Sequence, residues 1–71
     1  MTLTPTRLAK IRKDLNWTFE VMGKKTGYSR GYIHKFESGQ SPITKEFSNR
    51  LMNALEIHIK EIEKIIVLLA K

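Results

Sequence analysis

Residues 18–39, TFEVMGKKTGYSRGYIHKFESG, carry the densest set of local structural signals in the chain. Thr18 is a suitable N-cap for a helix over about 19–26, because its hydroxyl can accept a hydrogen bond from a first-turn N–H. Gly27 is expected to end that helix, since glycine adopts the left-handed conformation at low cost. Ser29 can cap a second helix that ends at Gly39. The stretch therefore predicts two short helices joined by a turn of a few residues.

The side chains of these two predicted helices divide into an inward and an outward set. Met22, Ile33 and Phe36 have the spacing of buried helix faces, and Gly23 is small where the two helices must touch. The outward positions of the second helix are polar or basic. Two short helices joined by a tight, glycine-containing turn are typical of a helix-turn-helix, which we place at about residues 18–38. In that motif the second helix enters the major groove of DNA and the first crosses the backbone.

Three further helices are predicted outside this unit, over about residues 5–15, 45–55 and 59–70. Thr4 and Thr44 are suitable N-caps for the first two of them. No Gly or Pro divides the last two, so the sequence leaves open whether they are separate. The expected fold is all-α, a compact five-helix domain that occupies residues 1–71 as a single unit.

The net charge of +6 is confined to one part of the chain. Residues 1–45 carry nine Lys or Arg and three acidic side chains, whereas residues 46–71 carry four of each. A basic region on a small domain is expected where the partner is a polyanion such as DNA or RNA. A basic surface that only keeps the protein in solution is the alternative.

Several functional classes lack the residues they require. The chain has no cysteine, which excludes disulfides and thiolate zinc sites. His34 and His58 have no second ligand at metal spacing, and no catalytic constellation is present. We therefore predict no enzymatic activity, no metal and no cofactor. The longest apolar run, residues 65–70, is far shorter than the roughly 20 residues that cross a bilayer, and we expect a cytoplasmic protein held at the nucleoid by DNA binding.

The segment 7–55 resembles the phage-repressor (Cro/cI-like, XRE) helix-turn-helix DNA-binding domains. The matching features are Arg12 in the first helix, Glu37-Ser38-Gly39 at the end of the third, Pro42 before the fourth, and Leu55-Glu56-Ile57 as a turn into a fifth. The resemblance implies a lambda-repressor-like five-helix fold and a partly buried ion pair between Arg12 and Glu37; a phosphate contact is the alternative for Arg12. It also implies a sequence-specific transcriptional regulator, a repressor of phage or mobile-element type, that binds a palindromic double-stranded DNA operator as a homodimer.

Two positions depart from that family. Phe19 stands where relatives often carry a glutamine that contacts phosphate, so only backbone N–H groups can make that contact here. Gly31 occupies a position that often reads a base. It costs the helix about 1 kcal/mol relative to Ala, and it allows close approach of the DNA backbone or of a thymine methyl group.

The outward side chains of the second motif helix are the candidate DNA base contacts: Arg30, Tyr32, His34 and Lys35. Arg30 is the strongest of them, because arginine can donate two hydrogen bonds to guanine O6 and N7. The candidate phosphate contacts are Lys10, Thr18, Phe19, Lys24, Lys25, Ser29, Ser38 and Lys45. The alternative for both sets is a solvated surface. Trp17 could stack on a base, but its position favours the core.

The last predicted helix is more apolar than one buried face requires. At about 100° per residue one face is shared by Ile59, Ile62, Ile65, Ile66 and Leu69, with Val67 and Leu68 outside it. Because a small domain that exposes this surface would associate, we predict a dimer interface of Ile62, Ile65, Ile66, Leu68 and Leu69. One alternative is a stripe buried within the monomer. Another is an antitoxin-like module whose apolar helix captures a regulatory or other partner protein. A peripheral membrane helix is disfavoured because the segment is not Lys-rich.

Overall fold

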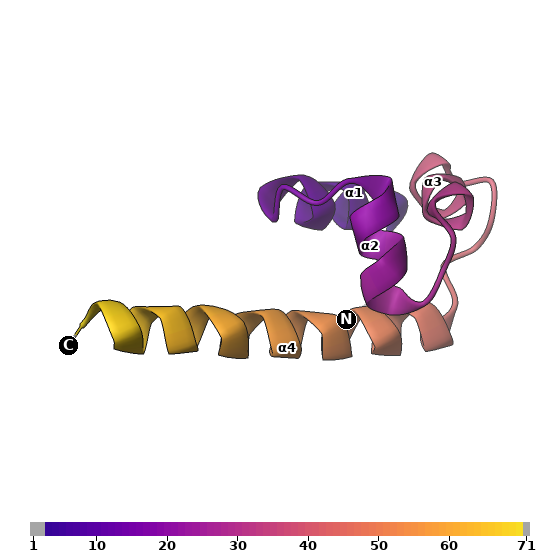
Figure 1. The fold of residues 1–71 in the computed structure, drawn as a ribbon. Coiled ribbons are helices and arrows are strands. Elements are labelled where there is room, and N and C mark those ends of the chain that lie inside the picture. Colours follow the sequence, from indigo (N-terminus) through magenta and orange to yellow (C-terminus); the bar gives the residue numbers. More distant parts are fainter. Residues whose placement is uncertain (1–2, 71) are drawn as a thin grey trace.

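The computed structural model describes residues 3–70, which form four α-helices and no strand (Figure 1). The helices are α1 (Pro5–Asp14), α2 (Phe19–Thr26), α3 (Arg30–Ser38) and α4 (Lys45–Leu69). The all-α class predicted from the sequence is confirmed, and the predicted helix-turn-helix unit corresponds to α2 and α3. We call residues 3–58 the body and residues 59–69 the arm, because only the body packs around a core.

Each helix begins at a hydroxyl side chain that was predicted as its cap. Thr4, Thr18, Ser29 and Thr44 accept hydrogen bonds of 3.1–3.2 Å from the backbone N–H groups of Arg7, Val21, Tyr32 and Phe47, respectively. Such caps satisfy N–H groups that have no partner within the helix. Gly27 and Gly39 end α2 and α3 with φ of 83° and 80°, as their sequence positions predicted.

The turn between α2 and α3 is tight because the two helices meet at Gly23. A Cβ added at Gly23 would collide with the carbonyl oxygen of Tyr28 and lie 3.3 Å from the carbonyl carbon of Ser29. The N–H groups of Gly27 and Tyr28 both donate to the Gly23 carbonyl, at 2.8 and 2.9 Å. Any larger residue at this position would therefore push α3 away from α2.

The core of the body is built from side chains of all four helices. Fully buried side chains include Leu8 of α1, Met22 of α2, Ile33 and Phe36 of α3, and Phe47 of α4. The rings of Phe36 and Phe47 lie 4.6 Å apart, which seats α3 on the first turn of α4. Trp17 joins the same cluster with 8% of its surface exposed. Its predicted place in the core is confirmed, and a role in stacking on a base is not compatible with this burial.

The prediction of five helices is wrong, because one continuous helix spans the region expected to contain the last two. α4 runs from Lys45 to Leu69 without a break. The residues at the expected turn, Leu55-Glu56-Ile57, and His58 after them include no glycine or proline, so nothing interrupts the backbone hydrogen bonds. His58 also packs against Trp17, with ring centroids 5.5 Å apart, which holds the helix in line at this point.

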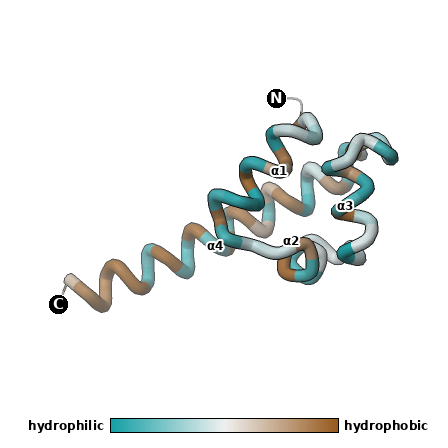
Figure 2. The backbone as a smooth tube through the Cα atoms, turned by 90° about the horizontal axis from the view of Figure 1, so that it is seen from above, coloured by the Kyte–Doolittle hydropathy of each residue, from teal (hydrophilic) through white to brown (hydrophobic). Residues whose placement is uncertain are grey.

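Continuity of α4 carries the arm away from the body. The molecule measures 47 × 22 × 20 Å, and Figure 1 shows the C-terminal half of α4 extending beyond the other helices. Figure 2 shows hydrophobic residues along this extension. The large arm side chains are 42% exposed at Ile62 and 81% exposed at Leu69. The alternative in which the stripe is buried within one monomer is therefore wrong. Within the described residues, no helix combines the length and apolarity needed to cross a membrane.

Candidate nucleic-acid interface

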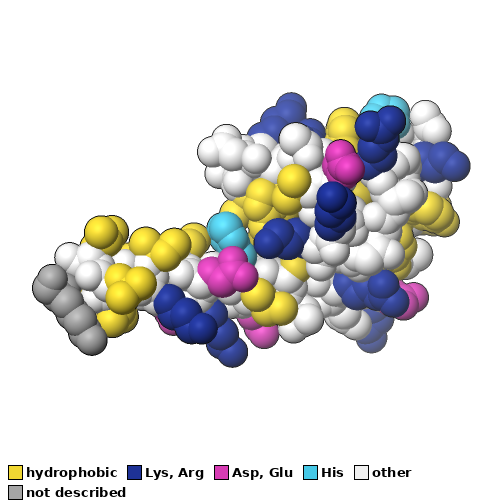
Figure 3. Space-filling model, viewed as in Figure 1, with side chains coloured by type: hydrophobic (Ala, Val, Ile, Leu, Met, Phe, Trp, Pro, Cys, Tyr) yellow, Lys and Arg dark blue, Asp and Glu magenta, His cyan; other side chains and the backbone are white. Residues whose placement is uncertain are grey.

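α3 presents one buried and one free face. Ile33 and Phe36 point into the core, whereas Arg30, Gly31, His34 and Lys35 are exposed on the other side. Because α3 has its cap at Ser29 and its stop at Gly39, the local sequence fixes both ends of this surface. In Figure 3 several Lys and Arg side chains lie over the body, and hydrophobic side chains dominate the arm. The exposed face of α3 is thus the polar and basic surface that the motif requires.

The first turn of α2 and the first half of α3 line one hollow on the surface. Thr18, Phe19 and Glu20 lie on one side of it, and Arg30, Gly31 and His34 lie on the other. A Cβ added at Gly31 would have no atom within 4 Å, so the missing side chain leaves open space. The rings of Phe19 and His34 meet nearly at right angles, with centroids 5.5 Å apart and an interplanar angle of 82°. The hollow therefore combines an apolar ring, an open glycine and a guanidinium.

An ion pair between α1 and α3 fixes the orientation of the exposed helix. Arg12 Nε and Nη2 donate to the two carboxylate oxygens of Glu37 at 2.7 and 3.1 Å, and Arg12 Nη1 donates to the Trp17 carbonyl at 3.0 Å. The side chains of Arg12 and Glu37 are only 12% and 8% exposed. The Arg12 guanidinium also lies 4.2 Å over the Phe19 ring. With these contacts made, Arg12 is a structural residue and is not available to phosphate.

The same contacts explain why Phe19 fits at a position where relatives often carry a glutamine. Its ring lies between the Arg12 guanidinium and His34, and it packs at the edge of the core. A cation over an aromatic face is stabilising by about 0.5–2 kcal/mol. Phe19 thereby links the buried ion pair to the exposed face of α3.

Tyr32 differs from the other predicted base contacts. Its ring centroid lies 5.1 Å from that of Phe36 and 5.8 Å from that of Tyr28, although 46% of the residue is exposed. Lys35 Nζ lies 5.9 Å from the centre of the same ring. Tyr32 therefore sits at the flank of the exposed face and packs against the core as well as facing solvent.

The predicted phosphate contacts do not form one cluster. Thr18 and Phe19 lie at the hollow, and Ser29 caps the helix that borders it. Lys24 and Lys25 are in the last turn of α2, the end that rests on α4, and Lys24 lies 3.8 Å from Glu20. The remaining candidates are dispersed: Lys10 pairs with Asp14 at 3.5 Å, Ser38 donates to the Lys35 carbonyl at 3.2 Å, and Lys45 opens α4.

Sequence reasoning missed Arg50, which joins α2 to α4. Its Nη1 donates to the Thr26 carbonyl at 3.3 Å, and its Nη2 donates to Glu46 at 3.0 Å. The guanidinium lies 2.7 Å from where a Cβ of Gly27 would be. The only sequence signal was the four-residue spacing of Glu46 and Arg50, which indicates a helical pair but not the contact with α2.

A comparison with protein families identifies the class that this architecture defines. The model of the helix-turn-helix domain family matches residues 6–64, and the chain belongs to that family. The match covers α1 to α3 and most of α4. Membership of the family indicates that the protein binds double-stranded DNA and acts in transcription regulation, in a family that is typically non-enzymatic. Neither the curated proteins nor the solved structures gave a match.

Proposed function

We propose that the protein is a sequence-specific transcriptional repressor of phage or mobile-element type that inserts α3 into the major groove of its operator. The observation that carries this proposal is the hollow shared by the start of α2 and the exposed face of α3. Helix N-termini favour anions, so the start of α2 suits a phosphate while α3 faces the base edges. The assignment as a repressor, rather than an activator, rests on the resemblance to phage repressors.

Arg30 is the residue to which we assign direct readout of a base. It lies in the first turn of α3, is exposed, and borders the hollow. His34 and Lys35 follow on the same face and contribute base or phosphate contacts. Phe19 has no donor on its side chain, so its backbone N–H and that of Glu20 serve the phosphate at the start of α2.

The operator is palindromic in this proposal, and the protein binds it as a homodimer. One α3 spans only a few base pairs, whereas two copies related by a two-fold axis place two recognition helices about one DNA turn apart. Exposed Ile62, Ile65, Ile66, Leu68 and Leu69 on the arm supply an apolar surface for association.

Selection of bound sequences from random duplex DNA tests the proposal. We expect the wild type to select two inverted half-sites, and Arg30→Ala to lose preference at one base position per half-site at a cost of about 1–3 kcal/mol. Lys24→Ala is the matched control. Lys24 lies in the last turn of α2 as a predicted phosphate contact, so its loss should weaken binding to all sequences about equally. An unchanged selected motif for Arg30→Ala would show that α3 does not read bases as proposed.

A further inference from the structure

The apolar side chains of α4 form a stripe that begins on the body and continues to the tip of the arm. They recur at alternating spacings of four and three residues, which is the a/d pattern of a coiled-coil seam. The stripe consists of Met52, Leu55, Ile59, Ile62, Ile66 and Leu69. Met52 is 61% exposed, Ile59 53% and Ile66 57%, whereas Leu55 is half-buried. The stripe is long and regular enough to pair with another helix over its whole length.

An apolar groove lies beside the first part of this stripe, between α1 and α4. Its lining is Leu3, Arg7, Ile11, Ser48, Leu51, Met52 and Leu55. Met52 and Leu55 belong both to the groove and to the stripe. The groove thus lies at the body end of the stripe, while Leu69, the most exposed large apolar side chain of the described residues, lies at the other end.

We propose that two copies of the chain pair through α4 in antiparallel orientation, so that the tip of each arm fills the groove of the other copy. This inference rests on the homodimer of the proposed function and specifies how it is built. A register with its two-fold axis between Lys60 and Glu61 places each residue of the stripe opposite a stripe residue of the second copy. Ile59 then faces Ile62 of the second copy, Leu55 faces Ile66, and Met52 faces Leu69.

The flanks of the stripe agree with this arrangement. Leu51 and His58 border the stripe on the side where α4 packs on the body, and His58 contacts Trp17. In an antiparallel pair the equivalent flanks of both copies lie on the same face, so both α3 helices face the same side. Ile65 lies on that flank, near His58 of the second copy. This proximity accounts for an apolar side chain at position 65, beside the stripe.

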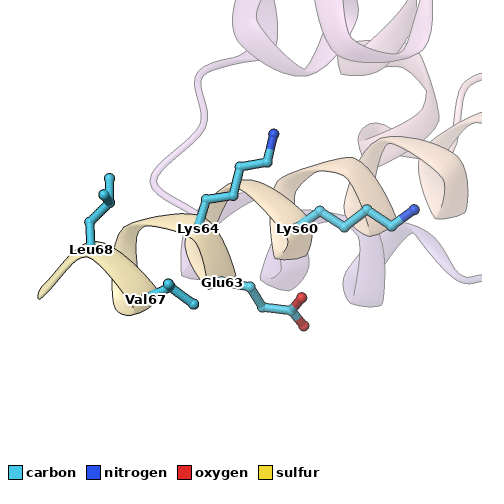
Figure 4. A pocket seen from close by; sticks show the side chains of 5 residues that line it. All are labelled: Lys60, Glu63, Lys64, Val67 and Leu68. Carbon is cyan, nitrogen blue, oxygen red and sulfur yellow. The ribbon is translucent and has the colours of Figure 1, made fainter. Parts of the chain in front are cut away.

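The other flank of the stripe is charged. It carries Glu56 and Glu63, and Lys60 lies four residues after the first and three before the second, so it can offset repulsion between the carboxylates of the two copies. Figure 4 shows Lys60, Glu63 and Lys64 on the arm. These charges keep that side of the pair in water.

The spacing of the recognition helices supports this register. α3 is seated on α4 at Phe47, through the 4.6 Å contact with Phe36. At 1.5 Å per residue, Phe47 lies about 20 Å from the proposed two-fold axis, which separates the two α3 helices by about 40 Å along α4. One turn of DNA is about 34–36 Å. Moving the axis by half a heptad toward the C-terminus would give about 50 Å. Moving it toward the N-terminus would give about 30 Å, which fits DNA as well as 40 Å does, but it would set Ser48 against Ile66.

Disulfide trapping distinguishes the possible pairings, and the native chain has no cysteine to interfere. Leu55→Cys protein is mixed with ¹⁵N-labelled Ile66→Cys protein at micromolar concentration, without DNA, and oxidised in a glutathione buffer. Mass spectrometry then separates the mixed disulfide from the two symmetric ones. We expect the mixed disulfide to account for nearly all covalent dimer. Met52→Cys with labelled Leu69→Cys should behave in the same way, which guards against a folding defect in one variant.

Ile57→Cys mixed with Ile66→Cys is the matched control, because Ile57 is exposed but lies off the stripe, and this pair should stay uncrosslinked. Symmetric disulfides of Leu55→Cys and of Ile66→Cys would show parallel pairing and overturn the inference. A wild type that sediments as a monomer would overturn the dimer itself. Because no DNA is present, a failure of operator recognition leaves these outcomes unchanged.

Discussion

The two halves of α4 have nearly opposite environments although they form one helix. The first half contributes Phe47, Leu51 and Ala54 to the core, at 5% exposure or less. The second half leaves Ile59, Ile62, Ile66 and Leu69 more than 40% exposed. Both halves carry similar numbers of apolar side chains, so composition does not distinguish them. The difference teaches that α1 to α3 cover one face of the first half, whereas the large apolar side chains of the second half are all exposed. We propose that the second half is apolar for a contact with a second copy of the chain.

The largest effect is expected from the double variant Ile66→Asp/Leu69→Asp, which removes apolar surface from the second half of α4. Both changes lie on the arm and touch nothing in the body, so the helices should survive while the dimer is lost. Two linked sites commonly gain 10²–10⁴ in affinity over one, and we expect operator affinity to fall by about that factor. Titration of operator DNA followed by fluorescence anisotropy measures the loss, and circular dichroism checks the fold. Unchanged affinity would mean that the arm has no part in DNA binding.

A second variant destabilises the body and leaves the arm unchanged. Glu37→Gln removes the partner of Arg12, which is only 12% exposed, and should lower the free energy of unfolding by about 3 kcal/mol. Replacing the pair together, by Arg12→Met and Glu37→Leu, should recover much of this loss because no charge is left buried. Urea denaturation gives both values. Asp14→Asn is the control, since its pair with Lys10 is exposed and worth less than about 1 kcal/mol. Equal stability of Glu37→Gln and wild type would contradict the structural role of the pair.

The smallest effect is expected at Gly31, and it separates stability from recognition. A Cβ at this position meets open space, so Gly31→Ala should raise the free energy of unfolding by about 0.5–1 kcal/mol through helix propensity. The same methyl group would project into the hollow beside Arg30, and the preferred base there should change. Thermal unfolding and sequence selection measure the two effects. A stabilised variant with an identical selected motif would place Gly31 outside the DNA contact.

Much of the body could be predicted because its signals are local. The caps at Thr4, Thr18, Ser29 and Thr44 each bond to a backbone group three residues away, so short sequence windows contain all the necessary information. The end of α2 at Gly27 is local in the same sense. For these elements, side-chain chemistry and backbone preference alone specify the structure.

The features that could not be predicted depend on distant parts of the chain. Arg50 contacts Thr26 across 24 positions, and Phe19 lies between Arg12 and His34 from two other helices. Separate helices were expected over about residues 45–55 and 59–70, and the resemblance to a family with a turn at Leu55-Glu56-Ile57 supported this division, whereas the local sequence holds no helix breaker. At that point local propensity was the better guide.

The salt dependence of DNA binding tests most directly the claim that the body contacts DNA and the arm joins two bodies. If a dimer neutralises roughly 6–10 phosphates, log affinity for the selected operator should fall against log salt concentration with a slope of about −5 to −9. The monomeric variant Ile66→Asp/Leu69→Asp should give about half that slope, because each binding event then involves one body. A slope near zero for the wild type would contradict DNA binding by the basic body. The same slope for both proteins would contradict the role of the arm.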